Sequence, residues 1–516
     1  MHYLCLMDKK IRLRFAPSPT GGLHLGGIRT VLYNYLFAKK HGGDFILRIE
    51  DTDQGRFVEG AEQYILDTLE WAGLIPDESP AHPGAYGPYR QSERKLTGIY
   101  ERQAHALVAA GHAYFAFDTP EELDTMRQEL KTESNPSPQY DHTTRMKMRN
   151  SLTLGEAETK RLLDAGERHV VRIKIEPGQE VKFTDMIRGE ISFDTSTVDD
   201  KVLLKADGMP TYHLAVVCDD HDMQITHAFR GEEWLPSAPV HILLWQYLYG
   251  LDQMPQWAHL PLILGPNGKL SKRDGAKYGF PVFGMNWTDP KTLELTEGFR
   301  EKGFLPEAFI NLLALLGWND GTEKELFSIE ELISQFSIER VHSAGAKFDY
   351  EKAKWFNHEW IKQLSASRLR PHVKTVLANH NIPVLDDAML DKVVDLVKER
   401  CTLLPDFATQ AGFFFQAPIT LDLSAIQGKW TPEKKTFFDS FAGYISGQTL
   451  ADAAALEAAF KEQATAAGIK PGELQLPFRI MLVGGKFGPP VFDIALMIGA
   501  DETVRRIKFA LGQLEG

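Results

Sequence analysis

The sequence predicts a multidomain α/β protein, in which an inserted α/β segment interrupts a doubly wound sheet and a helical C-terminal region follows. Three observations lead to this prediction. The 516 residues exceed what one ordinary core holds and correspond to about three to four packed units. A strand, loop, helix, strand unit opens the chain, and helical periodicity dominates after about residue 306. Hydrophobic residues make up 43% and charged residues 25%, so composition gives no case for disorder.

The opening unit occupies residues 11–49. Residues 11–16 alternate arginine with apolar side chains, a sharp turn follows, and apolar residues then recur at helical spacing until Gly42. The loop delivers His24 and two glycines to the helix N-terminus. Backbone N–H groups and the helix dipole favour phosphate at such a place, so we predict a nucleotide phosphate beside His24.

The remaining elements follow from periodicity and turn residues. We expect helices at 59–73, 94–111, 241–249, 309–316, 385–398 and 450–467, and strands at 45–49, 170–175, 191–193, 202–204 and 212–217. The periodicity changes between about residues 112 and 195, which indicates a domain inserted between the two halves of the sheet.

Charge and cysteine content limit the function classes. The net charge of −13 argues mildly against nucleic acid as partner, although a local basic groove on an acidic protein still binds it. Cys5, Cys218 and Cys401 lie far apart, which predicts neither a disulfide framework nor a zinc site and favours a reducing cytosol. No run approaches about 18 apolar residues, and residues 1–10 lack the order of a signal peptide. We therefore expect a cytoplasmic protein without membrane contact.

Two short segments carry the predicted chemistry. Residues 17–27 combine a rigid turn, an imidazole and glycines, whereas residues 269–273 place two lysines and an arginine around Ser271. Alone, the first is also compatible with a simple helix cap and the second with a solvated basic loop. The pair, with His24 and the second segment about 245 residues apart, is much more informative than either member.

This pair resembles the HIGH and KMSKS signatures of class I aminoacyl-tRNA synthetases. Segments elsewhere look like glutamyl-tRNA synthetase and extend the resemblance over nearly the whole chain. They are residues 14–21 (RFAPSPTG), 48–53 (RIEDTD), 87–94 (GPYRQSER), 203–213 (LLKADGMPTYH), 230–234 (RGEEW), 348–349, 355–357, 476–479 and 488–489.

The resemblance implies how the chain is divided. The implied parts are a Rossmann-type catalytic domain in two halves at 1–111 and 196–255, an inserted acceptor-stem-binding α/β domain at 112–195, the KMSKS loop with a tRNA stem-contact region at 256–340, and an α-helical anticodon-binding region at 341–516.

A glutamate substrate carries two carboxylates and one ammonium, so its pocket needs guanidinium groups and an acceptor. The resemblance places Arg14, Ser18, Glu50, Tyr212 and Arg230 around the amino acid. Arg14 and Arg230 are suited to the carboxylates and Glu50 to the ammonium. Two alternatives stay open: a solvated strand-end carboxylate for Glu50, and an ordinary surface ion pair for Arg230.

The resemblance also implies an ATP site. Its residues are Thr20, His24, Gly26, Gly27, Glu233, Trp234, Lys269, Ser271 and Lys272. His24 and Lys272 are the catalytic candidates, which with Mg²⁺ counter the charge on the phosphates. A core position for Trp234 is the alternative. Some family members bind zinc through cysteines, but residues 113–117 offer no ligands, so no structural zinc is expected.

The implied activity is that of a glutamate-tRNA ligase, which activates L-glutamate with ATP and transfers it to the 3′ end of tRNA(Glu), acting as a monomer. Arg400 aligns with an arginine that reads the anticodon in discriminating members, and a solvated charge is its alternative. Other readings are a non-discriminating form that also charges tRNA(Gln), a glutaminyl enzyme, a tRNA-modifying relative, a small-molecule nucleotidyltransferase and a noncatalytic tRNA-binding protein.

Two features depart from the family pattern. Val216 stands where the family often has asparagine, which removes one expected polar contact to the amino acid. Residues 278–304, after the second signature, form a longer segment than expected, and the sequence assigns it no function.

Overall fold

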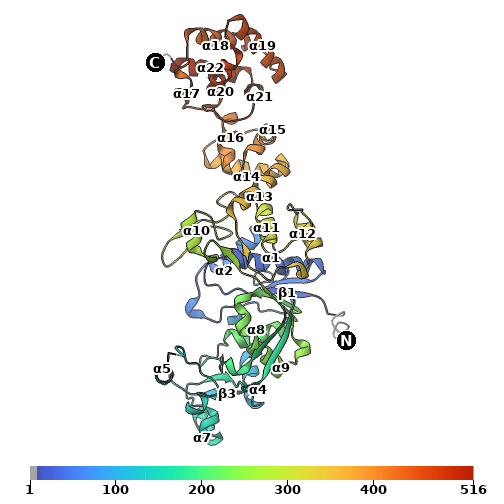
Figure 1. Cartoon of the computed structure of the whole chain (residues 1–516), viewed down its shortest axis with the longest axis vertical. Helices are drawn as coiled ribbons and strands as arrows, with labels where there is room; N and C mark the ends of the chain where they lie inside the picture. The colour runs from blue at the N-terminus through green and yellow to red at the C-terminus, as the bar shows by residue number, and fades with distance from the viewer. Residues whose placement is uncertain (1–8, 134, 515–516) are drawn as a thin grey trace. The chain divides into compact units, whose positions relative to one another are not determined.

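The computed structural model describes residues 9–133 and 135–514 (Figure 1). It contains two compact units: one runs up to Phe299 and includes Ile310–Asp349, and the other consists of Arg300–Phe309 and the chain from Tyr350. Cys5 and most of the segment on which the signal-peptide expectation depends lie outside the described residues.

The first unit holds every strand of the described chain. The strands are β1 (Arg12–Phe15), β2 (Asp44–Leu47), β3 (Ala113–Ala116), β4 (Val170–Ile173), β5 (Glu180–Asp185), β6 (Gly189–Asp194), β7 (Val202–Leu204), β8 (His227–Gly231), β9 (Gln256–Leu260), β10 (Ile263–Gly265), β11 (Gly268–Lys269), β12 (Trp287–Thr288), β13 (Leu295–Thr296) and β14 (Ala346–Lys347). The helices are α1 (Leu25–Lys40), α2 (Ala61–Trp71), α3 (Gln91–Lys95), α4 (Ile99–Ala109), α5 (Pro120–Glu129), α6 (Ser151–Leu154), α7 (Glu156–Asp164), α8 (Tyr212–Asp222), α9 (Ala238–Leu248), α10 (Lys272–Tyr278) and α12 (Ile329–Gln335). Helix α11 (Pro306–Leu315) has residues in both units.

The six-stranded sheet determines where a ligand can bind. Its strand order is β2-β1-β8-β9-β5-β6, and every pairing is parallel except that of β5 with β6. From β1 the chain moves outward to β2, whereas from β8 it moves in the opposite direction to β9, so the topology reverses between β1 and β8. Ligands of doubly wound sheets bind at the carboxyl ends of the strands at this point. The doubly wound prediction is thus confirmed, and α1 packs on β1, β2 and β8 (Figure 1).

The inserted segment has a small sheet of its own. Strands β3, β4 and β7 form an antiparallel sheet, and helices α5, α6 and α7 lie in the chain between β3 and β4. We expected residues 112–195 to form one inserted domain. The hairpin β5–β6 instead pairs with β9 at the edge of the six-stranded sheet, so the end of this segment belongs to the main sheet.

The strand expected at 212–217 is wrong. These residues open helix α8, whose residues Leu214–Asp220 are all buried. A short apolar run that is buried on every side lacks the one-sided periodicity that distinguishes a helix from a strand. Val216 lies in the hydrophobic core, which agrees with its apolar character.

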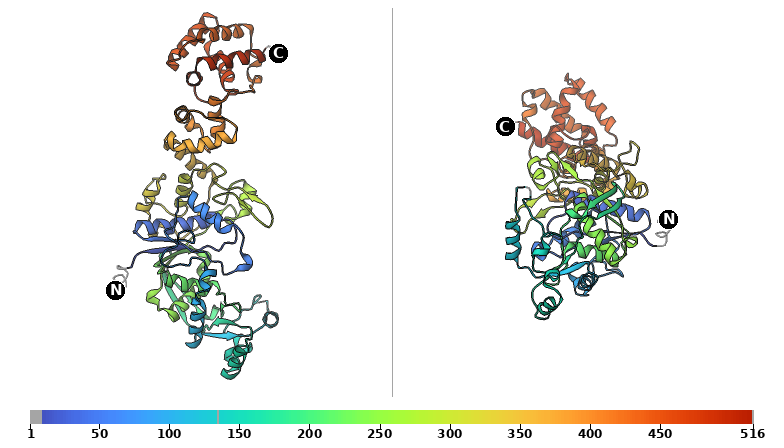
Figure 2. Two further views of the ribbon diagram at one scale, coloured as in Figure 1. Left: turned by 180° about the vertical axis from the view of Figure 1, so that it is seen from behind. Right: turned by 60° about the horizontal axis from the view of Figure 1, so that its bottom comes forward.

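The second unit is helical throughout its described residues, as predicted (Figure 2). Its helices are α13 (Tyr350–Gln363), α14 (Ala366–Asn379), α15 (Asp387–Val397), α16 (Asp406–Phe415), α17 (Ser424–Gln427), α18 (Pro432–Ile445), α19 (Ala453–Ala466), α20 (Pro471–Val483), α21 (Val491–Ile498) and α22 (Ala500–Leu514). Phenylalanines from four of these helices pack edge to face or stacked in its core, including Phe441, Phe460, Phe478 and Phe492.

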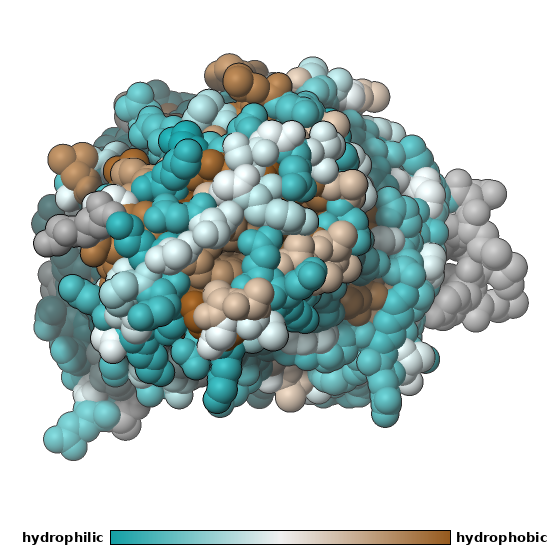
Figure 3. Space-filling model, turned by 90° about the horizontal axis from the view of Figure 1, so that it is seen from above, coloured by the Kyte–Doolittle hydropathy of each residue, from teal (hydrophilic) through white to brown (hydrophobic). Residues whose placement is uncertain are grey.

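One face of the chain is mainly polar. Figure 3 shows a face that hydrophilic side chains largely cover, with smaller hydrophobic areas between them. Among the described residues, no helix combines the length and the apolar character that crossing a membrane requires. Cys218 and Cys401 are both buried thiols.

Candidate functional site

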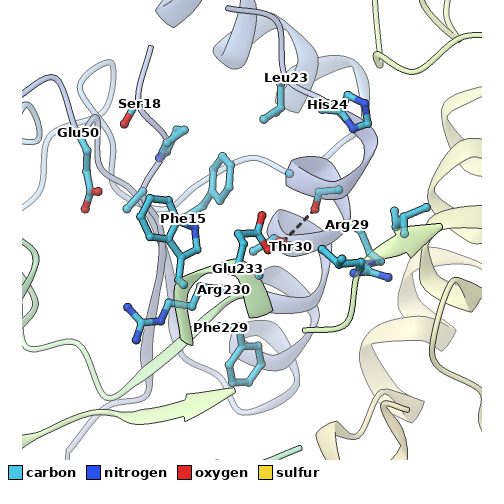
Figure 4. Close-up of a pocket in the computed structure, with 18 of the residues that line it drawn as sticks. Phe15, Ser18, Leu23, His24, Arg29, Thr30, Glu50, Phe229, Arg230 and Glu233 are labelled. Carbon is cyan, nitrogen blue, oxygen red and sulfur yellow. Dashed lines mark hydrogen bonds between the residues drawn. The ribbon is translucent and has the colours of Figure 1, made fainter. Parts of the chain in front are cut away.

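A cavity of about 500 Å³ lies at the reversal point of the six-stranded sheet, at the carboxyl ends of β1 and β8 (Figure 4). Most of the residues predicted from the sequence line it: Arg14, Ser18, Thr20, His24, Gly26, Gly27, Glu50, Tyr212, Arg230, Glu233, Trp234 and Lys269. Figure 4 shows Glu50 and the Arg230 guanidinium on one side of this space and His24 on the other. The cavity therefore has two chemically different ends.

His24 and the start of α1 form one end. His24 occupies the N-cap position, no side chain caps the helix, and no acidic residue lies in its first turn. A Cβ on Gly26 would meet no atom within 4 Å, whereas one on Gly27 would come within 2.7 Å of Leu23. The helix N-terminus is thus open to the cavity, with the geometry that binds phosphate.

His24 is uncharged near neutral pH. Burial, together with the nearby charges of Lys272 and Lys269, lowers its pKa to about 4. A neutral imidazole keeps one N–H donor and adds no formal charge. The positive charge at this end therefore comes from the lysines.

The second signature lies beside this end. Lys269 lines the cavity and forms a 3.5 Å ion pair with Glu233, whereas Ser271 and Lys272 lie outside the cavity wall. Ser271 is the N-cap residue of helix α10, and its backbone N–H and its hydroxyl both donate to the carboxylate of Asp274, at 2.9 and 2.7 Å. Lys272 extends its ammonium 5.0 Å from the centre of the Phe283 ring.

The segment 278–304, to which the sequence assigned no function, packs against the first signature. The Phe283 ring lies 5.9 Å from the imidazole of His24, edge to face. Trp287 is buried, and a Cβ on Gly22 would come within 2.8 Å of its ring. Because Phe283 contacts both His24 and Lys272, this segment connects the two signatures physically.

Glu50 forms the other end together with a buried ionic network. Its carboxylate accepts a 2.9 Å hydrogen bond from Arg48. Asp220 accepts from Arg48 at 2.8 Å and from two nitrogens of Arg14, at 3.0 and 3.1 Å. Burial raises the pKa of Glu50, while Arg48 and Arg14 oppose that change. With 6% exposure, Glu50 is not a solvated carboxylate.

Arg230 is buried, and no carboxylate of the described residues pairs with it. Its Nε donates to His259 at 2.9 Å, and its Nη1 donates to Tyr212 and His241, each at 3.2 Å. Its Nη2 is buried without any partner among the described residues. The surface ion pair considered for Arg230 is therefore excluded, and Arg230 lines the cavity with one of its buried donors unpaired within the described residues.

Trp234 and Glu233 lie on the 3₁₀ turn after β8, spanning Glu232–Ser237. Trp234 is 42% exposed and its ring lies 4.6 Å from that of Tyr212, so the core position considered for it is wrong. Both side chains line the cavity.

Arg400 belongs to the second unit. It ends a short 3₁₀ turn (Lys398–Arg400) and is exposed. Its charge lies close enough to lower the pKa of Arg479, although burial is the larger cause of that shift. Two arginines thus lie near one another on this unit.

Several residues of the site were not predicted from the sequence. Arg29, Asp220, His241 and His259 were missed, and Arg48 was seen only as part of a motif. Arg29 lines the cavity and donates to two backbone carbonyls, of Leu316 at 2.9 Å and of Pro261. No local pattern marks His241 and His259, because their importance comes from contact with Arg230.

Comparisons with known proteins agree with this geometry. Residues 10–355 match the family model described as tRNA synthetases class I (E and Q), catalytic domain, and residues 351–511 match an anticodon binding domain. The chain is 49% identical to a glutamate–tRNA ligase of Amoebophilus asiaticus and 47% identical to one of Cytophaga hutchinsonii, each alignment covering 98% of both chains.

A solved structure is similar over the same extent. The crystal structure of a glutamate tRNA ligase from Elizabethkingia meningosepticum has a TM-score of 0.91 and 48% identity, covering 98% of this chain and 100% of that one. The two signatures meet at one cavity of a doubly wound sheet, and a helical unit follows. The chain belongs to the class I aminoacyl-tRNA synthetases of the glutamyl and glutaminyl group.

Proposed function

We propose that this chain is a glutamate-tRNA ligase, which activates L-glutamate with ATP and transfers it to the 3′ end of tRNA(Glu). The observation that carries the amino-acid assignment is Arg230, which lines the cavity and whose buried Nη2 has no partner among the described residues. A buried guanidinium without a carboxylate is matched best by an anionic side chain, since an unpaired buried donor is unfavourable. Relatives with this name, which align with the chain over nearly their full length, support the proposal.

On the amino-acid side, Arg230 binds the side-chain carboxylate and Glu50 accepts from the ammonium group. Glu50 is suited to this task because Arg48 holds its carboxylate in place. Arg14, Ser18 and Tyr212 complete this end of the cavity. Arg14 contributes positive charge, although Asp220 already takes two of its donors.

ATP is the co-substrate of class I synthetases. In our proposal the backbone of Gly26 and Gly27 and the neutral His24 bind its phosphates at the start of α1. Lys269 and Lys272 supply the positive charge, and Ser271 holds the loop in place through Asp274. Thr20, Glu233 and Trp234 line the rest of the nucleotide side.

We also propose that Mg²⁺ accompanies the nucleotide. The described residues contain no group of three or more carboxylate, histidine or cysteine side chains that would bind a cation alone. This fits the usual behaviour of Mg²⁺, which takes one or two protein carboxylates together with substrate phosphates. When bound, it would offset phosphate charge, while the protein groups position the reactants.

The proposed reaction has two steps. The α-carboxylate of glutamate attacks the α-phosphorus of ATP, the bond to the β-phosphate oxygen breaks, and pyrophosphate leaves with glutamyl-adenylate still bound. A ribose hydroxyl of the terminal adenosine then attacks the acyl carbon, and AMP leaves. His24, Lys269 and Lys272 stabilise the charge on the phosphates, and no enzyme nucleophile is needed.

We propose that the tRNA contacts follow the five-part division of the chain. Residues 112–195 would contact the acceptor stem, residues 256–340 the adjoining stem, and the helical region, through Arg400, the anticodon. The exposed position of Arg400 supports that role, because a base edge has to reach its donors. We also propose that the protein acts as a monomer in the cytoplasm, where its tRNA and ATP substrates are found.

Charging assays with purified protein test the proposal. We expect glutamyl-tRNA to form from ATP, glutamate and tRNA(Glu), with little product from glutamine. Preferred charging by glutamine would contradict the amino-acid assignment. Parallel reactions with tRNA(Glu) and tRNA(Gln) decide between a discriminating enzyme and one that also glutamylates tRNA(Gln).

A further inference from the structure

The groups that directly contact the Arg230 side chain are neutral. Its hydrogen-bond acceptors are the imidazoles of His259 and His241 and the phenol oxygen of Tyr212, and its guanidinium lies 4.7 Å from the centre of the Trp257 ring. Neither imidazole lines the cavity. The two imidazoles therefore affect a substrate only through Arg230.

His259 is the cross-strand partner of Arg230. The register of β8 and β9 pairs the two residues directly, so their side chains lie on the same face of the sheet. Asp185 on β5 accepts from both the backbone N–H and the Nδ1 of His259, at 3.0 and 2.6 Å. A carboxylate only accepts, so the proton of His259 is on Nδ1 and its Nε2 lone pair faces Arg230.

His241 is a second neutral acceptor for Arg230. Arginine only donates, so the Nδ1 of His241 accepts from Arg230, and its Nε2–H donates to the Nδ1 of His213 at 3.1 Å. Protonation of His241 would direct an N–H against the N–H of Arg230. Burial and the charge of Arg230 both lower the pKa of His241 well below its usual value, which keeps the ring neutral.

Arg14, the second arginine at this end of the cavity, has a different setting. Its Nε and Nη2 both donate to the carboxylate of Asp220. A guanidinium that is already paired with a carboxylate attracts a further anion weakly. A guanidinium held by neutral acceptors keeps its whole charge and favours a carboxylate over an uncharged amide.

We propose that His241 and His259 are positioning residues that hold Arg230 through neutral acceptors, so that its uncompensated charge selects glutamate over glutamine. This inference rests on the proposed function, because it assumes that Arg230 binds the substrate's side chain. Asp185 and His213 act one contact further out by fixing the two imidazole tautomers.

A pair of isosteric variants tests the role of charge. His241→Gln supplies a neutral oxygen acceptor for Arg230, and His241→Glu supplies a charged one of almost the same shape. We expect H241Q to keep the preference for glutamate. We expect H241E to raise the glutamate KM about 10- to 100-fold, the range of one charge-assisted hydrogen bond, with the ATP KM unchanged.

The outcomes separate this inference from the proposed function. If wild type does not charge glutamate, the proposed function fails first. If wild type does so but H241Q and H241E lose the preference equally, or neither loses it, the charge argument is overturned. Melting temperatures of both variants show whether a loss reflects misfolding.

A second pair keeps the test decisive if H241E does not fold. His259→Gln retains an acceptor for Arg230 and a donor for Asp185, whereas His259→Leu removes both without adding charge. We expect H259L, and not H259Q, to raise the glutamate KM while the ATP KM stays constant. Equal glutamate KM values for the two variants would overturn the positioning role.

Discussion

At the scale of single residues, the basic side chains at the two ends of the cavity differ in their burial and in their partners. Arg230 is buried among neutral acceptors, whereas Lys269 has an ion pair and more than half of its side chain exposed. A buried charge interacts more strongly with a ligand than an exposed one, because water screens the exposed charge. In our proposal, selection of the amino acid therefore depends mainly on Arg230 and less on the exposed lysines.

Lys272→Ala tests the proposed role of the second signature. Lys272 lies outside the cavity wall beside Phe283, and in our proposal its ammonium binds the phosphates of ATP. We expect kcat to fall about 100-fold, the usual effect of removing one electrostatic donor, while the tRNA Kd changes little. Steady-state charging kinetics and a tRNA-binding titration measure the two quantities.

Lys277→Ala is the matched control for this experiment. Lys277 is an exposed lysine on the same helix, 5.1 Å from the ring centre of Tyr278, and it does not line the cavity. It should leave kcat near the wild-type value. Equal losses of tRNA affinity and turnover in Lys272→Ala would count against a role in the reaction step.

At the scale of elements, the sequence predicted best those features whose signals lie in consecutive residues. The β1–loop–α1 unit was predicted because strand, turn and helix signals occur in consecutive residues, and it brings Arg14 and His24 to the cavity. Residues 212–217 were misassigned because helix α8 is buried on all sides. His259 could not be found because its pairing with Arg230 depends on the register of two strands.

Strand β8 also contains a buried histidine that makes stability depend on pH. His227 is 6% exposed, its Nδ1 lies 2.9 Å from Thr226 Oγ1, and burial lowers its pKa to about 4. At pH values between about 4 and about 6.5, this histidine is protonated in the unfolded chain but neutral in the folded protein. Stability therefore falls with decreasing pH in this window, by up to about 1.4 kcal/mol per pH unit for this residue.

His227→Gln removes that contribution while keeping a polar side chain. We expect the melting temperature of wild type to approach that of H227Q as the pH decreases from 7 to 5. Other buried histidines affect both proteins equally, so the difference between them isolates His227. A gap that stays constant over this range would show that His227 does not titrate differently in the folded and unfolded states.

At the scale of the whole molecule, our proposal assigns a different kind of recognition to each of the two units. The first contains the complete cavity, and the second contains the exposed Arg400 on a helical scaffold. The net charge of −13 is compatible with this division, since local basic groups rather than the global balance determine where a polyanion binds. The sequence indicated both parts through the pair of signatures and the change to helical periodicity.

The most direct test of the account compares glutamate and glutamine as substrates of wild type and Arg230→Gln. Arg230 provides the unpaired buried donor on which the amino-acid assignment depends. We predict that R230Q lowers kcat/KM for glutamate by about 100-fold or more, with a much smaller change for glutamine, so that the preference disappears. An unchanged preference for glutamate in R230Q would contradict the account.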